Sequence, residues 1–234
     1  MQSNKDLRTL AVDIGGSGIK AIVLDTSGNP QTERSRVETP QPALTQPVIN
    51  AISSLAAAQG EFDRVSVGFP GVVRRGITET AVNLDPEWIG FDLGSALVQS
   101  LAKPVRVAND ADMQGLGATS GKGVELVITL GTGFGSALFL EGKLVPNLEL
   151  GHHPFRKGET YEEQLGRRAL DEVGSKKWNL RLEKAIASIQ HLFNCDRLYI
   201  GGGEAKKVTL DLPSNVKIIP NLSGLLGGIA LWQD

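Results

Sequence analysis

The sequence predicts an α/β protein made of two similar halves with a ligand cleft between them. Strands and helices alternate along the chain, and one strand-loop-strand pattern occurs twice. The stretch "LAVDIGGSGIKAIVLD" (Leu10 to Asp25) aligns without a gap with "LVITLGTGFGSALFLE" (Leu126 to Glu141). Each copy contains an apolar strand, a glycine loop and a second apolar strand. Equivalent glycine loops in two α/β halves favour a cleft, because ligands are usually held in concave sites.

The elements of the first half follow from apolar periodicity and from turn residues. Two strands flank the first glycine loop, and a helix, a strand, a helix and a short strand follow. Their expected ranges are 8–14 and 19–25 for the flanking strands, then 42–59, 64–73, 91–102 and 104–110.

The second half repeats the strand pair and then becomes helical. We expect helices over 161–173 and 175–194, a strand over 196–201 that runs into glycines, and a terminal helix over 223–233. One apolar stripe predicts a helix face packed in the core or against a subunit: Trp178, Leu182, Ile186, Ile189 and Phe193. The predicted division is an N-terminal lobe over 1–109, joined by a helix at about 223–234, and a C-terminal lobe over 110–222.

Composition limits the classes of partner. The 234 residues carry a formal net charge of −2, so no overall field attracts nucleic acid or an anionic membrane. The single cysteine, Cys195, excludes a disulfide framework and a cysteine cluster for zinc. No apolar run reaches the roughly 18 residues of a membrane span. We therefore expect a cytoplasmic protein with neither a nucleic-acid polymer nor a membrane as partner.

The glycine loops match neither common nucleotide motif. Gly121-Lys122 is followed by Gly123 and not by Ser or Thr, so no P-loop occurs, and no Gly-x-Gly-x-x-Gly leads from a strand into a helix. Both loops lie between two strands, where a plain turn is the alternative to a phosphate loop. Two such loops at equivalent places favour phosphate binding. The predicted phosphate-binding residues are Gly15, Gly16, Ser17 and Gly18 in one loop and Gly131, Thr132 and Gly133 in the other.

A family resemblance extends over nearly the whole chain. The motifs "DIGGSGIK", "LGTGFG" and "IGGG", in this order, resemble the two phosphate loops and the adenosine-side loop of the hexokinase, actin and heat-shock ATPase superfamily. Within it the chain resembles the ROK family of sugar kinases and is most similar to the polyphosphate glucokinases. The further motifs that carry this similarity are "TPQPA", "GFPGVV", "NLDPEWIG", "ANDADMQGLG" and "LVPNLELGH".

The resemblance implies a fold, an activity and a set of cofactors. The fold is the two-lobed, ribonuclease H-like (actin-like ATPase) fold, and the protein is a homodimer in sugar breakdown by glycolysis. The reaction transfers a phosphoryl group from polyphosphate, ATP or both to the 6-hydroxyl of glucose, with Mg²⁺ present. The usual ROK zinc site needs several cysteines, so no structural zinc is expected. Many relatives are repressors with an N-terminal DNA-binding domain, but the first strand is expected to start near Arg8, so we do not expect a repressor.

The same resemblance assigns roles to single residues. Asp110 is the expected general base, although "ND" could equally be a helix cap. The expected sugar ligands are Asn109, Glu149, His152 and either Glu162 or Glu163. Gly201, Gly202 and Gly203 would lie beside adenosine.

On the donor side, Asp13 would hold Mg²⁺ through water, since Mg²⁺ keeps part of its hydration shell. Lys20 would contact either phosphate or only solvent. Asn83 and Trp88 would order a loop over the sugar, or belong to the core. A long polyphosphate chain also needs a track of basic side chains. The candidates, for which an ordinary solvated surface is the alternative, are Arg156, Lys157, Arg167, Arg168, Lys176, Lys177, Lys206 and Lys207.

Two other functions remain open at this point. One is a ROK kinase for another hexose, such as mannose or an N-acetylated amino sugar. The other is a non-catalytic sugar sensor that has kept the fold. The presence of Asp13, Asp110 and both glycine loops together argues against the sensor, because a sensor needs no metal ligand and base.

Overall fold

The computed structural model describes residues 7–82, 84–220 and 223–233. These residues form two compact units. The first runs to Gly117 and includes the C-terminal residues 223–233, and the second runs from Ala118 to residue 220. The helix that begins at Asp110 therefore belongs to the first unit, although the lobe boundary was expected just before it.

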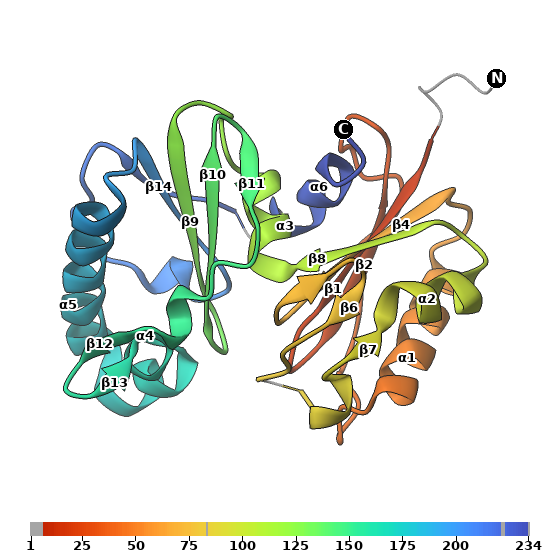
Figure 1. Cartoon of the computed structure of the whole chain (residues 1–234), viewed down its shortest axis with the longest axis horizontal. Helices are drawn as coiled ribbons and strands as arrows, with labels where there is room; N and C mark the ends of the chain where they lie inside the picture. The colour runs from red at the N-terminus through yellow and green to blue at the C-terminus, as the bar shows by residue number, and fades with distance from the viewer. Residues whose placement is uncertain (1–6, 83, 221–222, 234) are drawn as a thin grey trace. The chain divides into compact units, whose positions relative to one another are not determined.

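The first unit is a five-stranded sheet with helices on both faces (Figure 1). Its strand order is β3-β2-β1-β4-β8. The strands are β1 (Thr9–Ile14), β2 (Ile19–Leu24), β3 (Ser35–Val37), β4 (Arg64–Phe69) and β8 (Val105–Asn109). The helices are α1 (Thr45–Ala58), α2 (Leu93–Leu101), α3 (Asp110–Leu116) and α6 (Ser223–Ala230). A small three-stranded sheet adds β5 (Val73–Arg74), β6 (Ile77–Thr78) and β7 (Phe91–Asp92).

Alternation along β1 explains why both faces of this sheet are covered. Leu10 and Val12 point to the face on which α1 packs, whereas Ala11 packs with Leu225 and Ile229 of α6 on the opposite face. A strand that is apolar on both faces must be buried on both, and all of these side chains are buried.

The second unit repeats the same sheet order, β11-β10-β9-β14-β15. Its strands are β9 (Val124–Leu130), β10 (Phe134–Leu140), β11 (Lys143–Val145), β14 (Arg197–Gly201) and β15 (Val216–Ile218). Its helices are α4 (Tyr161–Leu165) and α5 (Arg167–Phe193), and β12 (Pro154–Arg156) pairs with β13 (Glu159–Thr160). In each unit the first strand is antiparallel to the second and parallel to the fourth, so the predicted duplication is present in the topology.

The gap-free alignment of the two copies is wrong by one residue after the loop. Ile14 pairs with Ile19, but Leu130 pairs with Phe134, so the second loop is one residue shorter than the first. One glycine divides the helical region differently from the prediction. The expected helix over 161–173 breaks at Gly166, where a Cβ would lie 2.9 Å from the carbonyl oxygens of Glu162 and Thr132. Gly174, with φ 76° and ψ 158°, interrupts the long α5 at the boundary predicted between the helices over 161–173 and 175–194.

Candidate functional site

The first glycine loop is held entirely by its carbonyl oxygens. Gly15 O accepts a hydrogen bond from Thr39 Oγ1, and Gly18 O accepts one from Gly15 N at 3.1 Å. Gln41 Nε2 donates to Gly16 O at 3.4 Å, and Arg36 Nη2 donates to Ser17 O at 3.0 Å. All four carbonyls of the loop are therefore engaged within the protein.

The second glycine loop has the same design with different partners. The backbone N of Arg167 donates to Gly131 O at 2.9 Å and to Thr132 O at 3.3 Å, and Gly131 N donates to Gly133 O at 3.1 Å. The carbonyls of Gly131 and Thr132 contact the junction between α4 and α5, where Gly166 lets the two segments approach closely. In the described parts of the chain, no hydrogen bond is donated by the backbone N–H of Gly16, Ser17, Gly18, Thr132 or Gly133. Loops whose N–H groups are left for a ligand are suited to bind an anion such as phosphate.

The third glycine run packs directly on the strand that leads into the second loop. Gly202 has φ +86°, and a Cβ there would lie 2.3 Å from Leu130 O, so only glycine fits. Glu204 N donates to Leu130 O at 2.9 Å. The Glu204 carboxylate is buried and forms an ion pair with the Arg167 guanidinium. The second loop and the glycine run are thus joined by one ion pair within the second unit.

Asp13 lies at the end of β1, beside the first loop. Its Oδ2 accepts a hydrogen bond from Lys20 Nζ at 2.8 Å, so Lys20 contacts the expected metal ligand and is not simply solvated. Asp13 is 27% exposed, which leaves it reachable from solvent. Among the described residues, no group of three or more His, Cys, Asp or Glu side chains could hold a metal ion. A single carboxylate beside a glycine loop that could bind phosphate is compatible with Mg²⁺, which usually takes one or two carboxylates and fills its other positions with water and phosphate oxygens.

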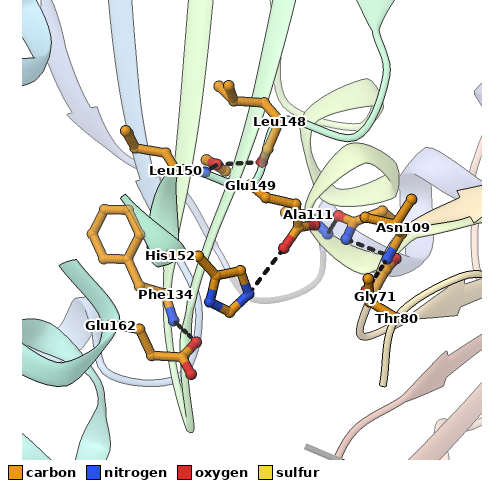
Figure 2. Close-up of polar contacts among 12 residues, drawn as sticks. Gly71, Thr80, Asn109, Ala111, Phe134, Leu148, Glu149, Leu150, His152 and Glu162 are labelled. Atoms are coloured by element: carbon orange, nitrogen blue, oxygen red, sulfur yellow. Dashed lines mark hydrogen bonds and ion pairs between the residues drawn. The ribbon is translucent and has the colours of Figure 1, made fainter. Parts of the chain in front are cut away.

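Of the two roles that the sequence left open for "ND", the structure shows the helix cap, and it is formed by Asn109. Asn109 Oδ1 accepts from Ala111 N at 2.8 Å and from Asp112 N at 3.1 Å, and its Nδ2 donates to Gly71 O at 3.1 Å (Figure 2). Asn109 is therefore the N-cap of α3, a role that occupies its oxygen and one amide hydrogen. Asp110 is the first residue of the helix, and its Oδ1 also accepts a hydrogen bond from Ala111 N at 2.8 Å.

Glu149, His152 and Glu162 form a polar group in the second unit. His152 Nε2 lies 3.2 Å from Glu149 Oε2, and Glu162 Oε2 accepts a hydrogen bond from Phe134 N at 3.1 Å (Figure 2). The structure does not bring Glu163 to this group. Its carboxylate completes the capping box of α4 by accepting from Thr160 N at 2.8 Å and from Thr160 Oγ1. Of the two candidates, Glu162 is the one that lies near the other expected sugar ligands.

The neighbours of Glu149 in this group have opposite effects on its pKa. Burial raises the pKa of the Glu149 carboxyl above its ordinary value. The neighbouring His152 lowers this pKa, and the nearby carboxylate of Glu162 raises it further. Two carboxylates and an imidazole on a half-buried surface are well suited to hydrogen-bond the hydroxyl groups of a sugar.

The sequence did not reveal how the first loop is held. Arg36, Thr39 and Gln41 lie on and after β3, and "TPQPA" was noticed only as a family motif. Trp88 belongs to the core: it is fully buried, packs on Phe69 and donates from Nε1 to Ala43 O at 2.8 Å. Asn83 lies outside the described residues. No helix within the described ranges is long and apolar enough to cross a membrane.

Comparisons with known proteins agree on one family. The family model described as "ROK family" matches residues 9–164. A polyphosphate glucokinase from Mycobacterium tuberculosis is 32% identical over 237 residues, covering 92% of this chain and 88% of that protein. The crystal structure of an inorganic polyphosphate/ATP-glucomannokinase from Arthrobacter sp. strain KM superposes with a TM-score of 0.88 and 36% identity, covering 97% of this chain and 99% of that one.

A ROK family glucokinase from Streptomyces griseus, solved with glucose and AMPPNP, has the same fold. Its TM-score is 0.80 at 21% identity, and the match covers 96% of this chain and 98% of that chain.

Proposed function

The chain belongs to the ROK family, and we propose that it is a glucokinase that transfers a phosphoryl group from polyphosphate or ATP to the 6-hydroxyl of glucose. The observation that carries this proposal is the pair of glycine loops with every carbonyl engaged by the protein. The backbone N–H groups of Gly16, Ser17, Gly18, Thr132 and Gly133 are left for phosphate oxygens. Similarity to a polyphosphate glucokinase and to a polyphosphate/ATP-glucomannokinase, each over most of the chain, supports a glucose kinase.

Asp110 is the proposed general base. As the 6-hydroxyl oxygen forms its bond to phosphorus, the bond from phosphorus to the leaving phosphate breaks, and Asp110 takes the hydroxyl proton. Its place at the start of α3, next to the capping residue, fixes the backbone beneath it. Gly68 allows this close packing, because a Cβ there would lie 3.4 Å from Asp110 Cα and 2.9 Å from Met113 Cε.

Glu149, His152 and Glu162 are the proposed ligands of the sugar hydroxyls. Sites that hydrogen-bond a hydroxyl reject analogues that lack it, because a polar group is then left without a partner. Glu149→Ala should weaken glucose binding, measured by calorimetry. Unchanged binding would remove Glu149 from this role.

Mg²⁺ would be held by Asp13 through water and would neutralise charge on the donor phosphates. The proposal also keeps a homodimer in the cytoplasm as the working form of the enzyme.

The decisive experiment is formation of glucose 6-phosphate with Mg²⁺, with long-chain polyphosphate and ATP supplied in parallel. Mannose is the second acceptor to test, because the Arthrobacter relative is a glucomannokinase; N-acetylglucosamine is the third. Turnover with mannose or the amino sugar but not with glucose would reassign the substrate. Sugar binding without turnover from either donor would favour a sensor.

A further inference from the structure

Three charged side chains form a row across the edge of the first sheet. Asp13 of β1 lies opposite Lys20 of β2, and Lys20 lies opposite Arg36 of β3. Residues directly opposite on neighbouring strands point to the same face of the sheet. The row therefore has one carboxylate and two cations on one face, immediately beside the first glycine loop.

Two cations opposite each other on neighbouring strands destabilise a sheet. Lys20 is compensated by Asp13, to which it donates at 2.8 Å. Arg36 is exposed, and its Nη2 donates to an uncharged carbonyl, Ser17 O. An anion bound at this edge would compensate the second charge.

Arg36 is also placed against the loop itself. A Cβ on Gly18 would lie 2.6 Å from Nε and Nη2 of Arg36, so the guanidinium lies directly over this glycine. The bond to Ser17 O uses one of the five N–H donors of a guanidinium, so other donors remain for the oxygens of a phosphate. The positive charge thus adjoins the loop whose N–H groups are left for phosphate.

We propose that Lys20 and Arg36 form a subsite for the phosphates of a polyphosphate chain that remain on the donor after transfer. This inference rests on the proposed function, because it places the donor on the first glycine loop. Polyphosphate carries negative charge along its whole length, whereas the phosphates of ATP are followed by an uncharged ribose and base. A guanidinium at the edge of the loop therefore favours polyphosphate over the nucleotide.

The test is Arg36→Gln, with Arg34→Gln as the matched control. Arg34 is an exposed arginine two residues earlier, just before β3 and outside the row. The KM for long-chain polyphosphate should rise about 5- to 10-fold in Arg36→Gln, in line with the loss of a charge-assisted contact. The KM for ATP should change several-fold less, and Arg34→Gln should match the wild type. The KM of Arg36→Lys for polyphosphate should lie between those of the wild type and Arg36→Gln, since lysine keeps the charge but not the several N–H donors of the planar guanidinium.

Salt dependence adds a second readout. Because the contact is ionic, the KM for polyphosphate should rise with ionic strength, and this slope should be smaller in Arg36→Gln. An equal loss with polyphosphate and ATP would mean that Arg36 only shapes the loop, and it would overturn the proposal. An unchanged KM for polyphosphate would overturn it as well.

Binding of long-chain polyphosphate without glucose or Mg²⁺, measured by calorimetry, separates this inference from the proposed function. If the wild-type protein transfers phosphate from no donor but binds polyphosphate more tightly than Arg36→Gln does, the subsite is supported and the kinase is rejected. Equal binding by both proteins, with active transfer from polyphosphate, would keep the kinase and reject the subsite.

Discussion

The imidazole of His152 lies 3.2 Å from the carboxylate of Glu149, from Nε2 to Oε2. This contact only partly offsets the penalty on a half-buried carboxylate, because burial and the nearby Glu162 both raise the pKa of Glu149. A group that a protein keeps despite such a penalty is expected to serve a ligand.

Glu149→Gln should stabilise the free protein at neutral pH. The raised pKa of Glu149 means that the folded state binds this proton more tightly than the unfolded state does. Wild-type stability should therefore fall relative to the variant as the pH rises from the ordinary glutamate value of about 4.3 through the raised value. Urea unfolding at pH 5, 6.5 and 8 should show a difference that grows with pH.

Glu163→Gln provides the matched control for this measurement. Hydrogen bonds from Thr160 lower the pKa of the Glu163 carboxyl. Its contribution is present above the ordinary pKa and is lost only as the pH falls through the lowered value. The variant should be less stable than the wild type by the same amount from pH 5 to 8. A pH-independent difference for Glu149→Gln would contradict the first expectation.

Asp110→Asn should impair turnover, whereas Asn109→Ala should impair stability. Asp110→Asn should lower kcat by about 10²- to 10⁴-fold, while glucose affinity and thermal stability stay close to wild type. Asn109→Ala removes the N-cap of α3 and should cost about 1 kcal/mol of unfolding free energy. Turnover assays, glucose calorimetry and urea unfolding measure all three quantities. Wild-type turnover in Asp110→Asn would exclude this residue as the base.

Arg167 and Glu204 should be energetically coupled. Arg167→Met leaves the buried Glu204 carboxylate without its cation and should cost about 1–3 kcal/mol. Adding Glu204→Gln should recover part of this loss, and a double-mutant cycle of unfolding free energies measures the coupling. The backbone bonds from residue 167 to the second loop remain in both variants. Additive losses would show that the pair does not hold the two segments together.

Gly202 and Gly131 should respond differently to alanine. At Gly202 the new Cβ would lie 2.3 Å from a backbone oxygen at φ +86°, so Gly202→Ala should destabilise the fold by more than about 1 kcal/mol. At Gly131 nothing lies within 4 Å of the Cβ position, so Gly131→Ala should stay close to wild-type stability. Thermal melting compares the two variants. Equal losses would mean that contact with Leu130 does not determine the need for glycine at 202.

The sequence predicted the family, the α/β class and the repeated strand-loop-strand pattern, and the comparisons and the topology confirm them. These features depend on local patterns, which a sequence displays directly. The shorter second loop escaped detection because apolar residues continue on both sides of it, and only the pairing of Leu130 with Phe134 reveals it. The break at Gly166 depends on a close approach to Thr132, a contact between distant residues.

The sequence predicted the residues of the candidate site but not the contacts that hold them in place. Both glycine loops, Asp13 and Asp110 could be named from motifs, whereas the contacts that hold the first loop come from side chains about twenty residues away. Glu162 and Glu163 are adjacent, and they are distinguished by the capping box of α4, which uses Glu163, and by the bond from Phe134 N to Glu162. Magnesium, the homodimer and the roles of the site residues remain predictions.

The bonds to the carbonyls of the first loop have a thermodynamic consequence. A flexible glycine loop would lose conformational entropy each time a donor bound, because glycine has more backbone freedom than any other residue. Here Arg36, Thr39 and Gln41 restrict that freedom during folding. The loop is therefore preorganised, and under the proposed function more of the interaction energy with phosphate would be available as affinity.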